Sequence, residues 1–388
     1  MTEKLYDLDS SVIEFDCKVS NLYNDGDLLA VETDRTAFFP EGGGQTSDRG
    51  ELGGVHVENV EIRGGTILHF VENSAENVQK FQKGVGLHGI VDWKKRFSDM
   101  QQHSGEHILS GIVHNHFGYN NVGFHLSENG VTVDFDGEFT ENGLCKVESL
   151  VNDVIWKNLE IRVSYPDEAA LATLPYRSKK EIDGPLRIVE IPGVDICACC
   201  APHVKRTGEI GLFRILSADR HRGGMRLSVL CGERALRDGR EKLNQNAAVS
   251  RLLSCKQTET AQFAQKMKAE KEALSFRLVG LQRTLLARQA DAAPPQKRFA
   301  EFLDADMETL RYYADLLADK AEDFAAVFSE TTPRQFVIFS KSGFDVNAAC
   351  AVLRTRFSAK GGGRNGNAQG AVDAGEEELK NALLNETS

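Results

Sequence analysis

The sequence predicts an α+β protein, because its strands and helices do not alternate as a doubly wound parallel sheet requires. Short β-branched segments fill the first 85 residues, helical and strand patterns then mix, and a long helical stretch precedes a final α/β segment. At roughly 150 residues per domain, 388 residues predict two or three domains. We expect a β-rich domain at 1–86, a mixed core at 87–238, a helical linker at 239–293 and a C-terminal α/β domain at 294–388.

The N-terminal domain is expected to be mainly β. Runs rich in β-branched residues at 28–33, 55–60 and 66–70 are separated by turn residues, which is the pattern of short strands. Eight glycines fall between residues 41 and 65. Such a density favours tight turns, or a backbone that lies close to another group.

The mixed core begins with a helical pattern. Apolar and histidine positions recur at spacings of three and four from 96 to 113, which predicts a helix. A second helix is expected at 147–156. Strands are expected at 123–126, 131–136, 188–191, 210–215 and 225–230.

The linker is predicted to be helical because it contains no proline and has a long stretch without glycine. No proline occurs between Pro202 and Pro294, and no glycine between Gly239 and Gly280. Apolar residues also recur every seven positions, as in Met267, Leu274 and Leu281. Residues 241–290 therefore form one long helix or a helical hairpin.

Composition excludes several classes of protein. With 41% hydrophobic and 27% charged residues, the chain is neither disordered nor collagen-like. It has no apolar run long enough for a membrane span and no secretion signal in MTEKLYDLDS, so we expect a cytoplasmic protein without a membrane partner. The net charge is −11, yet residues 175–240 hold thirteen Lys and Arg against eight Asp and Glu. A polyanionic partner therefore remains possible.

Two pairs of residues predict a metal site. His103 and His107 lie four apart in the helical pattern, hence on one face, and Cys199 and His203 have the same spacing. Three imidazoles and one thiolate suit tetrahedral Zn²⁺. The alternative is a pair of hydrogen-bonded core histidines beside inert cysteines. Cys197, Cys199 and Cys200 crowd into four residues, which favours metal or redox chemistry in a reducing compartment.

The same helix offers a competing interpretation. Residues 103–107 read HSGEH, which matches the inverted zinc-peptidase motif with Glu106 as the general base. Catalytic zinc in peptidases keeps a water position open, usually beside a carboxylate ligand. Here Cys199 and His203 would close the coordination sphere, so the peptidase is the less favoured hypothesis.

Three further segments are candidate binding elements. Residues 38–46 read FFPEGGGQT, where glycines allow close approach and Gln45 and Thr46 offer hydrogen bonds. The alternative is a polar β-turn. Lys360–Arg364 resembles a phosphate cradle without the Walker spacing, or is a flexible loop. Arg222 and Arg226 belong to a basic cluster around Gly223-Gly224 that suits phosphates, or is a solvated loop.

Several motifs together resemble the alanyl-tRNA editing proteins of the AlaX group. FPEGGGQ at 39–45 with DRG at 48–50 is similar to the glycine-rich motif of that group. DW at 92–93, Arg96, Met100 and HSGEHIL resemble the second motif, which the editing domains of alanyl- and threonyl-tRNA synthetases share. CCAPH at 199–203 with TGEIG at 207–211 resembles the third, although the synthetase form has glycines in place of Cys200 and Ala201. The run at 360–370 is similar to the DHH-associated domain of the long AlaX form.

The resemblance implies a fold and a function. It implies a small β-barrel-like N-terminal domain, a zinc-containing editing core and hydrolysis of the ester between a wrong amino acid and tRNA-Ala. Serine is the expected amino acid and glycine the second. One zinc ion per chain is implied, bound by His103, His107, Cys199 and His203. Gln45 and Thr46 become candidate catalytic residues of the editing pocket.

The resemblance also implies partners. The substrate is tRNA-Ala carrying a wrong amino acid, and a homodimer through the linker and C-terminal domain is possible. Nucleotide and ATP binding are further expected properties. A non-catalytic tRNA-binding module stays open as an alternative. The candidate tRNA-binding residues are Arg222, Arg226, Lys360, Gly361, Gly362, Gly363 and Arg364.

Overall fold

The computed structural model describes residues 2–127, 130–178 and 186–385. The chain forms two compact units, residues 1–245 and 246–388, and mixes α and β structure as the sequence predicts. The finer boundaries at 86, 238 and 293 stay predictions. Within the described ranges, no helix has the length and apolar character needed to cross a membrane.

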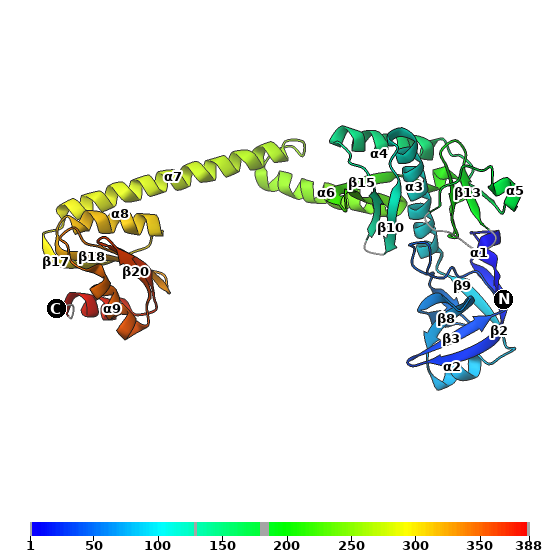
Figure 1. The fold of residues 1–388 in the computed structure, drawn as a ribbon, viewed down its shortest axis with the longest axis horizontal. Coiled ribbons are helices and arrows are strands. Elements are labelled where there is room, and N and C mark those ends of the chain that lie inside the picture. The colour runs from blue at the N-terminus through cyan, green and yellow to red at the C-terminus, as the bar shows by residue number, and fades with distance from the viewer. Residues whose placement is uncertain (1, 128–129, 179–185, 386–388) are drawn as a thin grey trace. The chain divides into compact units, whose positions relative to one another are not determined.

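The first part of unit 1 is a seven-stranded sheet that curls into a nearly closed barrel, blue to cyan in Figure 1. Its strand order is β6-β5-β9-β2-β3-β8-β7. The predicted strand at 28–33 is confirmed as β3, but the run at 55–60 divides into two strands at Glu58. The strands are β2 (Glu14–Asp25), β3 (Leu28–Thr33), β5 (Gly50–Leu52), β6 (Val55–Val57), β7 (Asn59–Arg63), β8 (Thr66–Glu72) and β9 (Gly86–Val91).

Short elements complete the barrel region. β1 (Glu3–Lys4) pairs in parallel with β4 (Arg35–Thr36), and α1 (Leu5–Leu8) follows β1 directly. Helix α2 (Ala75–Lys80) begins after Ser74, whose side chain accepts a hydrogen bond from the amide of Asn77.

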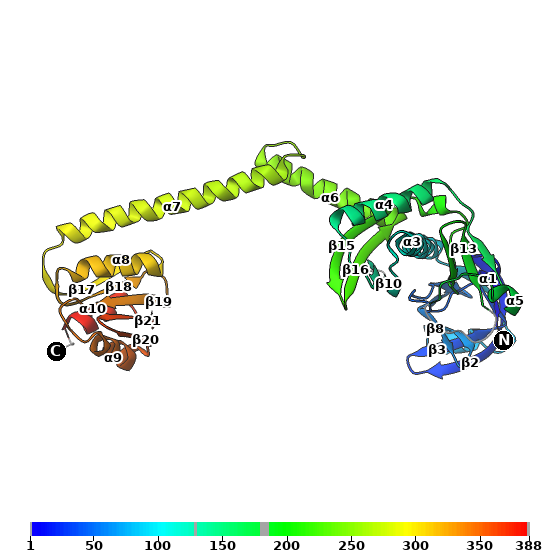
Figure 2. The same cartoon turned by 45° about the horizontal axis from the view of Figure 1, so that its top comes forward.

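Helix α3 (Trp93–Phe117) is the central element of unit 1 and confirms the helix predicted at 96–113. The Asp92 carboxylate caps it by accepting from the Lys95 amide, and Gly118 ends it with a φ of 73°. Most of the helix is buried, polar residues included. It therefore carries its functional side chains inside the protein, between sheets that cover it (Figure 2).

Two sheets and a helix enclose α3. One sheet has the order β10-β11-β16-β15 and the other β12-β13-β14. The elements of this part of unit 1 are β10 (Asn121–Ser127), β11 (Gly130–Phe135), α4 (Glu141–Trp156), β12 (Arg162–Ser164), α5 (Glu168–Leu171), β13 (Ile188–Ile191), β14 (Asp195–Ala198), η1 (Thr207–Ile210), β15 (Phe213–His221) and β16 (Gly224–Cys231).

The strand predicted at 210–215 is wrong in its first half. Residues Thr207–Ile210 form the 3₁₀ helix η1, and the strand starts only at Phe213. Gly211, with a φ of 80°, separates the two elements. Ile210 is fully buried in the core around α3. A buried apolar residue in a 3₁₀ helix gives the same sequence signal as one in a strand, which explains the wrong prediction.

A buried ion pair joins the barrel to α3. Arg96 is fully buried and pairs with Asp48, which follows the glycine-rich run. The same guanidinium donates to the carbonyl oxygens of Ala37 (2.5 Å) and Ser10 (3.0 Å). Since an unpaired buried charge is costly, this arrangement fixes the glycine-rich run against the helix.

The linker consists of two helices, so the expectation of one long helix is wrong. Helix α6 (Gly232–Leu253) ends before Ser254, whose φ is 52°, and α7 (Thr260–Ala292) begins after a turn. The Asn246 side chain ties the two helices by bonding to Gln257 and Thr260.

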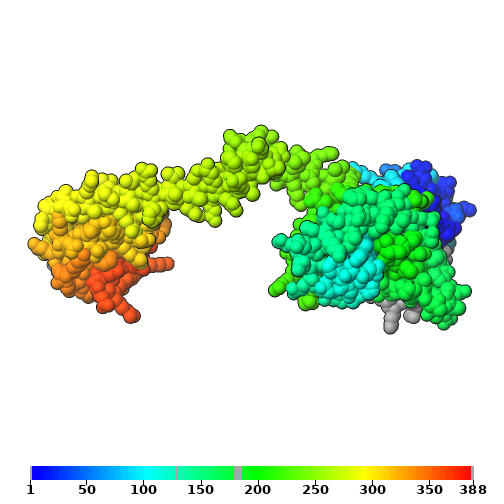
Figure 3. Space-filling model, turned by 90° about the horizontal axis from the view of Figure 1, so that it is seen from above, coloured from blue at the N-terminus to red at the C-terminus, as the bar shows by residue number. Residues whose placement is uncertain are grey.

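Unit 2 is a five-stranded sheet of order β17-β18-β19-β21-β20 between helices. Helix α8 covers one face, and α9 and α10 cover the other (Figure 1). Leu286 and Ala290 of α7 are buried among the residues packed around α8. On the face that Figure 3 presents, the middle turns of α7 are open to view. The elements after α7 are β17 (Gln296–Leu303), α8 (Met307–Ala318), β18 (Ala321–Ser329), β19 (Arg334–Phe339), α9 (Val346–Phe357), β20 (Lys360–Arg364), β21 (Asn367–Val372) and α10 (Glu376–Asn385).

Candidate metal centre

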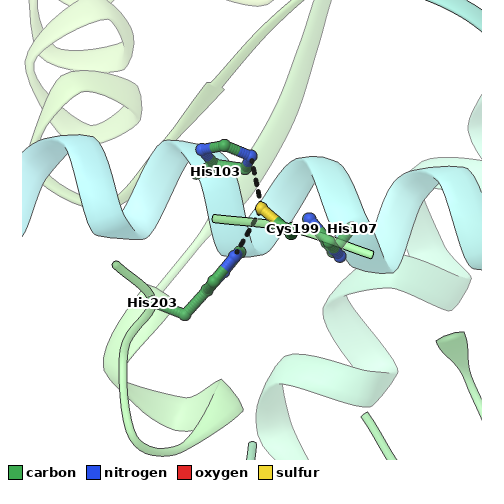
Figure 4. A group of neighbouring side chains, drawn as sticks. All are labelled: His103, His107, Cys199 and His203. Atoms are coloured by element: carbon green, nitrogen blue, oxygen red, sulfur yellow. Dashed lines mark hydrogen bonds between the residues drawn. The ribbon is translucent and has the colours of Figure 1, made fainter. Parts of the chain in front are cut away.

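The fold brings the four predicted ligand residues together (Figure 4). His103 and His107 project from adjacent turns of α3, while Cys199 and His203 come from the loop that follows β14. Cys199 Sγ lies 3.6 Å from His103 Nε2 and 3.4 Å from His203 Nε2. One ligand atom from each of the four residues lies within 4.8 Å of the others, so the cluster can hold a metal ion.

Each histidine is held through its other ring nitrogen. His103 Nδ1 donates to Gln45 Oε1 (2.9 Å) and His107 Nδ1 donates to the Asp195 carboxylate (3.0 Å). His203 Nδ1 lies 3.0 Å from Ser104 Oγ. Partners of this kind fix the tautomer and orientation of a metal-binding imidazole, and they leave Nε2 for the metal.

The electrostatics of the cluster suit a cation. Burial raises the pKa of the Cys199 thiol, but the neighbouring His103 and His203 lower it well below its usual value. Burial lowers the pKa of His203 to about 3, so this imidazole is neutral. Burial also disfavours charged His107, yet Cys197, Asp195 and Cys199 raise its pKa well above the usual value. A Cys199 thiolate and a neutral His203 in a negative surrounding fit Zn²⁺, which on binding would displace the proton that His107 carries in the metal-free cluster.

The glycine-rich run forms a tight turn beside the cluster. The backbones of Gly42 and Gln45 bond to each other, and Gly43 and Gly44 between them have φ values of 62° and 84°. Two positive φ values are typical of a type I′ turn, which favours glycine. A Cβ atom on Gly44 would lie 2.7 Å from the Phe124 carbonyl oxygen, so close approach also requires glycine there.

Gln45 is the predicted pocket residue that the turn brings to the metal ligands. Its side chain is 1% exposed, and its Oε1 accepts from His103. Its Nε2 is buried without a hydrogen-bond partner among the described residues. A buried donor without a partner is rare in proteins, which makes this amide a candidate ligand-binding group.

Thr46 has a different environment. Its hydroxyl oxygen accepts a hydrogen bond from Lys95 Nζ (3.2 Å), which also donates to the Ser47 carbonyl (2.7 Å) and to Asp99 (2.8 Å). Thr46 therefore contributes to a network that holds the glycine turn, and its predicted catalytic role stays a prediction.

Comparison with known proteins agrees with this site. The family model described as the threonyl and alanyl tRNA synthetase second additional domain matches residues 186–227, which include Cys199 and His203. The alanyl-tRNA editing protein AlaX-M of Saccharolobus solfataricus is 34% identical over 231 residues, which cover 56% of this chain and 94% of that relative. This chain belongs to the AlaX family of alanyl-tRNA editing proteins.

Longer relatives match in part. The alanyl-tRNA editing protein AlaX-L of Pyrococcus horikoshii is 31% identical over 245 residues, covering 61% of this chain and 59% of that protein. An alanine–tRNA ligase of Archaeoglobus fulgidus is 28% identical over 392 residues, covering 96% of this chain and 42% of the ligase. The chain spans about half the length of such relatives.

The place of Glu106 does not favour the peptidase hypothesis. Its carboxylate accepts from the Ser110 hydroxyl (2.7 Å) and from the Asn121 amide. Glu106 is 1% exposed and is not one of the residues that share the four-residue metal group. A carboxylate held by these two donors within the core is poorly placed to act as a base on a metal-bound water.

The candidate tRNA-binding residues lie apart from the metal centre or in the other compact unit. Arg222 is at the tip of the β15–β16 hairpin, with a φ of 47°, and Arg226 forms two hydrogen bonds with Asp134 (2.6 and 2.8 Å). Lys360–Arg364 forms the edge strand β20, paired with β21, and so is not a loop. Their role in binding tRNA stays a prediction.

Sequence reasoning missed three residues of this family member's site. Asp195 and Ser104 orient two of the histidines, and Arg177 holds the Asp195 carboxylate by two hydrogen bonds (2.7 and 2.9 Å). Asp195, His107 and Cys197 also form a second group with metal-ligand geometry. Ser104 lies between the predicted ligands, whereas nothing in the sequence pattern marks Asp195 or Arg177.

Proposed function

We propose that this chain is a trans-editing hydrolase that removes a wrong amino acid from tRNA-Ala, with serine as the first substrate and glycine as the second. One observation carries the proposal: the buried Gln45 amide lies directly against a His103–His107–Cys199–His203 cluster that can hold a metal ion. The names of the AlaX-M and AlaX-L relatives, alanyl-tRNA editing proteins, support the same activity.

We propose one Zn²⁺ per chain, bound by the three Nε2 atoms and the Cys199 thiolate. When bound there, zinc supplies Lewis-acid polarisation and a fixed point for the reacting end of the substrate. The chain's own residues hold that geometry: Gln45, Asp195 and Ser104 fix the three rings. Water is the proposed nucleophile.

Gln45 provides the proposed discrimination between seryl and alanyl esters. Its Nε2 is a buried donor without a partner in the described part of the chain. A serine hydroxyl can accept a hydrogen bond from it, whereas an alanyl side chain leaves it unpaired. An unpaired buried donor costs on the order of 1–3 kcal/mol, which favours the seryl ester in the transition state.

The proposed partner is tRNA-Ala carrying the wrong amino acid, in the cytoplasm. Arg222 and Arg226 in unit 1, and the Lys360–Arg364 strand in unit 2, are proposed phosphate contacts. A homodimer through α7 is proposed because several of its large apolar side chains are exposed. These residues are Met267, Leu274, Phe276, Leu278, Leu281 and Leu285.

The test is a deacylation assay on Ser-tRNA-Ala, Gly-tRNA-Ala and Ala-tRNA-Ala, with casein as the peptidase control. We expect release of serine, slower release of glycine, retention of alanine and intact casein. Purified protein should carry about one zinc per chain, and Cys199→Ser should lower that content. Protein with full metal content that leaves Ser-tRNA-Ala intact would refute the proposal.

A further inference from the structure

The loop that follows β14 carries two of the four candidate metal ligands, Cys199 and His203, while the other two belong to helix α3 (Figure 4). The helix is held in shape by its own backbone hydrogen bonds. Residues 199–204 belong to no helix or strand, so the position of this loop depends on groups outside it. What holds the loop therefore bears on how firmly a metal ion is retained.

Two side chains from outside the loop donate hydrogen bonds to its carbonyl oxygens. Arg187 Nη1 donates to the carbonyls of Cys199 and Ala201, both at 2.9 Å. The Ser10 hydroxyl donates to the carbonyl of His203 at 2.8 Å, from a segment 193 residues away in the sequence. Arg187 thus holds the first part of the loop, and Ser10 holds its end.

The neighbours of Ser10 also reach the chain just beyond the loop. Lys205 Nζ donates to the Ser11 hydroxyl (2.9 Å) and to the Asp9 carboxylate (3.2 Å). Both of these bonds are exposed to solvent, where an ion pair contributes little to stability. The Ser10 bond is partly buried. Of the polar contacts between this N-terminal segment and the loop, we therefore expect the Ser10 bond to matter most.

The backbone of Ser10 is itself anchored to α3. Its carbonyl oxygen accepts a hydrogen bond from Arg96 Nη1 at 3.0 Å. Arg96 projects from α3, is fully buried and pairs with Asp48, which follows the glycine turn. Ser10 therefore connects the end of the ligand loop, through its hydroxyl, with the helix that carries the other two candidate ligands, through its carbonyl.

We propose that Ser10 is a positioning residue for His203 and that its hydroxyl slows the release of the bound metal ion. This inference rests on the metal site of the proposed function. A metal ion with four ligands leaves after one ligand has moved away from it. The loop moves more readily than the interior of a buried helix, because it lacks the helix's own hydrogen bonds. Loss of the Ser10 hydroxyl removes the bond that ties the end of the loop to α3.

The experiment measures zinc release from the zinc-loaded, full-length protein to an excess of a chromogenic chelator. We expect Ser10→Ala to release zinc about fivefold faster than wild type, the factor that corresponds to a net hydrogen bond of about 1 kcal/mol. Ser10→Thr keeps a hydroxyl donor and should release zinc within about twofold of the wild-type rate.

Ser149→Ala is the matched control. The Ser149 hydroxyl on α4 also donates to a backbone carbonyl, that of Cys145, at 2.9 Å, and neither residue belongs to the ligand loop. This variant should release zinc at the wild-type rate. Circular dichroism establishes that each variant is folded.

A second measurement separates positioning of the ligand from a general loss of stability. Cobalt(II) in place of zinc reports the geometry of its ligands through its visible absorption bands. We expect these bands to shift in fully loaded Ser10→Ala and to stay unchanged in Ser149→Ala. Faster zinc release with unchanged cobalt bands would mean a general weakening of the fold and would overturn the positioning role.

The inference and the proposed function fail in different ways. If wild type hydrolyses Ser-tRNA-Ala but Ser10→Ala releases zinc at the rate of Ser149→Ala, Ser10 is not a positioning residue and the proposed function stands. If Ser10→Ala shows both effects while wild type leaves Ser-tRNA-Ala intact, the proposed activity fails and the role of Ser10 stands. Wild-type protein that takes up no zinc would refute both.

Discussion

Gln45 is the residue at which the barrel meets the histidine pair of α3. Its Oε1 orients His103, and its Nε2 is buried and unsatisfied in the described structure. The two halves of one amide thus serve different purposes. One orients His103, a candidate metal ligand, and the other is available to the proposed substrate.

Gln45→Ala removes both functions. We expect kcat/KM for Ser-tRNA-Ala to fall about 10- to 100-fold, the usual effect of losing a group that orients a metal ligand. Because Gln45 is not itself a ligand, zinc content should remain near one per chain. Kinetics and metal analysis of the same preparation check this. Unchanged activity at full zinc would show that Gln45 is not a pocket residue.

Glu106→Gln is expected to be mild. The side chain accepts hydrogen bonds from Ser110 and Asn121 within the core, and a glutamine oxygen can keep at least one of them. Activity on Ser-tRNA-Ala should fall tenfold or less, on the order of 1.4 kcal/mol in activation free energy. A loss of several powers of ten, with zinc retained, would instead make Glu106 a general base.

His69 gives the barrel a pH dependence. It is fully buried, lies against Thr36 and the Val31 carbonyl, and burial lowers its pKa to about 4. The folded state therefore binds fewer protons than the unfolded state, where histidine titrates near 6.5. This contribution to stability is full above pH 6.5 and is lost as the pH falls towards 4, in total about 3 kcal/mol.

The test is urea denaturation of wild type and His69→Asn between pH 7.5 and pH 4.5. The metal ligands titrate in both proteins, so the difference between their slopes isolates His69. Wild type should lose more free energy of unfolding over this range than the variant. Parallel slopes would contradict the assignment.

At the scale of elements, the first turn of α6 stabilises the glycine turn from two sides. Arg234 donates to Asp99 (2.7 Å), which accepts from Lys95, and Lys95 holds Thr46 and the Ser47 carbonyl. Arg234 also donates to the Ser127 carbonyl (2.8 Å) at the end of β10. The preceding residue of β10, Leu126, donates its amide to the Gly44 carbonyl (2.8 Å).

Arg234→Ala should therefore disturb Gln45 without touching the metal ligands. We expect kcat on the seryl ester to fall about tenfold while KM and zinc content change little. Arg234→Lys should recover part of the loss, since lysine keeps the charge. It loses the planar guanidinium that reaches Asp99, the Ser127 carbonyl and the Ser98 hydroxyl together. Equal kcat values for wild type and Arg234→Ala would show that this network does not position the turn.

At the scale of the whole molecule, the candidate metal centre belongs entirely to unit 1. That unit has its own hydrophobic cores, one in the barrel and one around α3. Unit 2 has separate cores on both faces of its sheet. The proposed ester hydrolysis thus belongs to unit 1, whereas the proposed tRNA contacts come from both independently packed units.

A protein that ends at residue 245 should keep ester hydrolysis on a minimal serylated acceptor-stem substrate. Full-length Ser-tRNA-Ala should show a higher KM, because the proposed contacts of β20 are lost. Sedimentation should give a monomer, since α7 is removed. A folded, zinc-containing truncation that fails on the minimal substrate would place part of the active site in unit 2.

Features that depend on residues close together in the sequence were predicted better than features that depend on contacts between distant residues. The helix around His103 and the strand at 28–33 were predicted correctly, because they follow from local periodicity. The four candidate ligand residues lie close enough together to hold a metal ion, but their role as ligands stays a prediction. The strand at 210–215 was half wrong, because burial of Ile210 against α3 gives the same apolar signal as a strand. The strand at Lys360–Arg364 was not predicted, because a run of glycines is compatible with a strand as well as with a loop.

The sequence by itself determined that His103 and His107 share one face, since a period of 3.6 residues places them there on any helix that contains both. It also determined the family, through three motifs in order. Only the tertiary structure decided what holds these donors. Gln45 reaches His103 across 58 residues, and Asp195 reaches His107 across 88. No local pattern encodes such contacts, because they exist only once the barrel, α3 and the β14 loop have packed together.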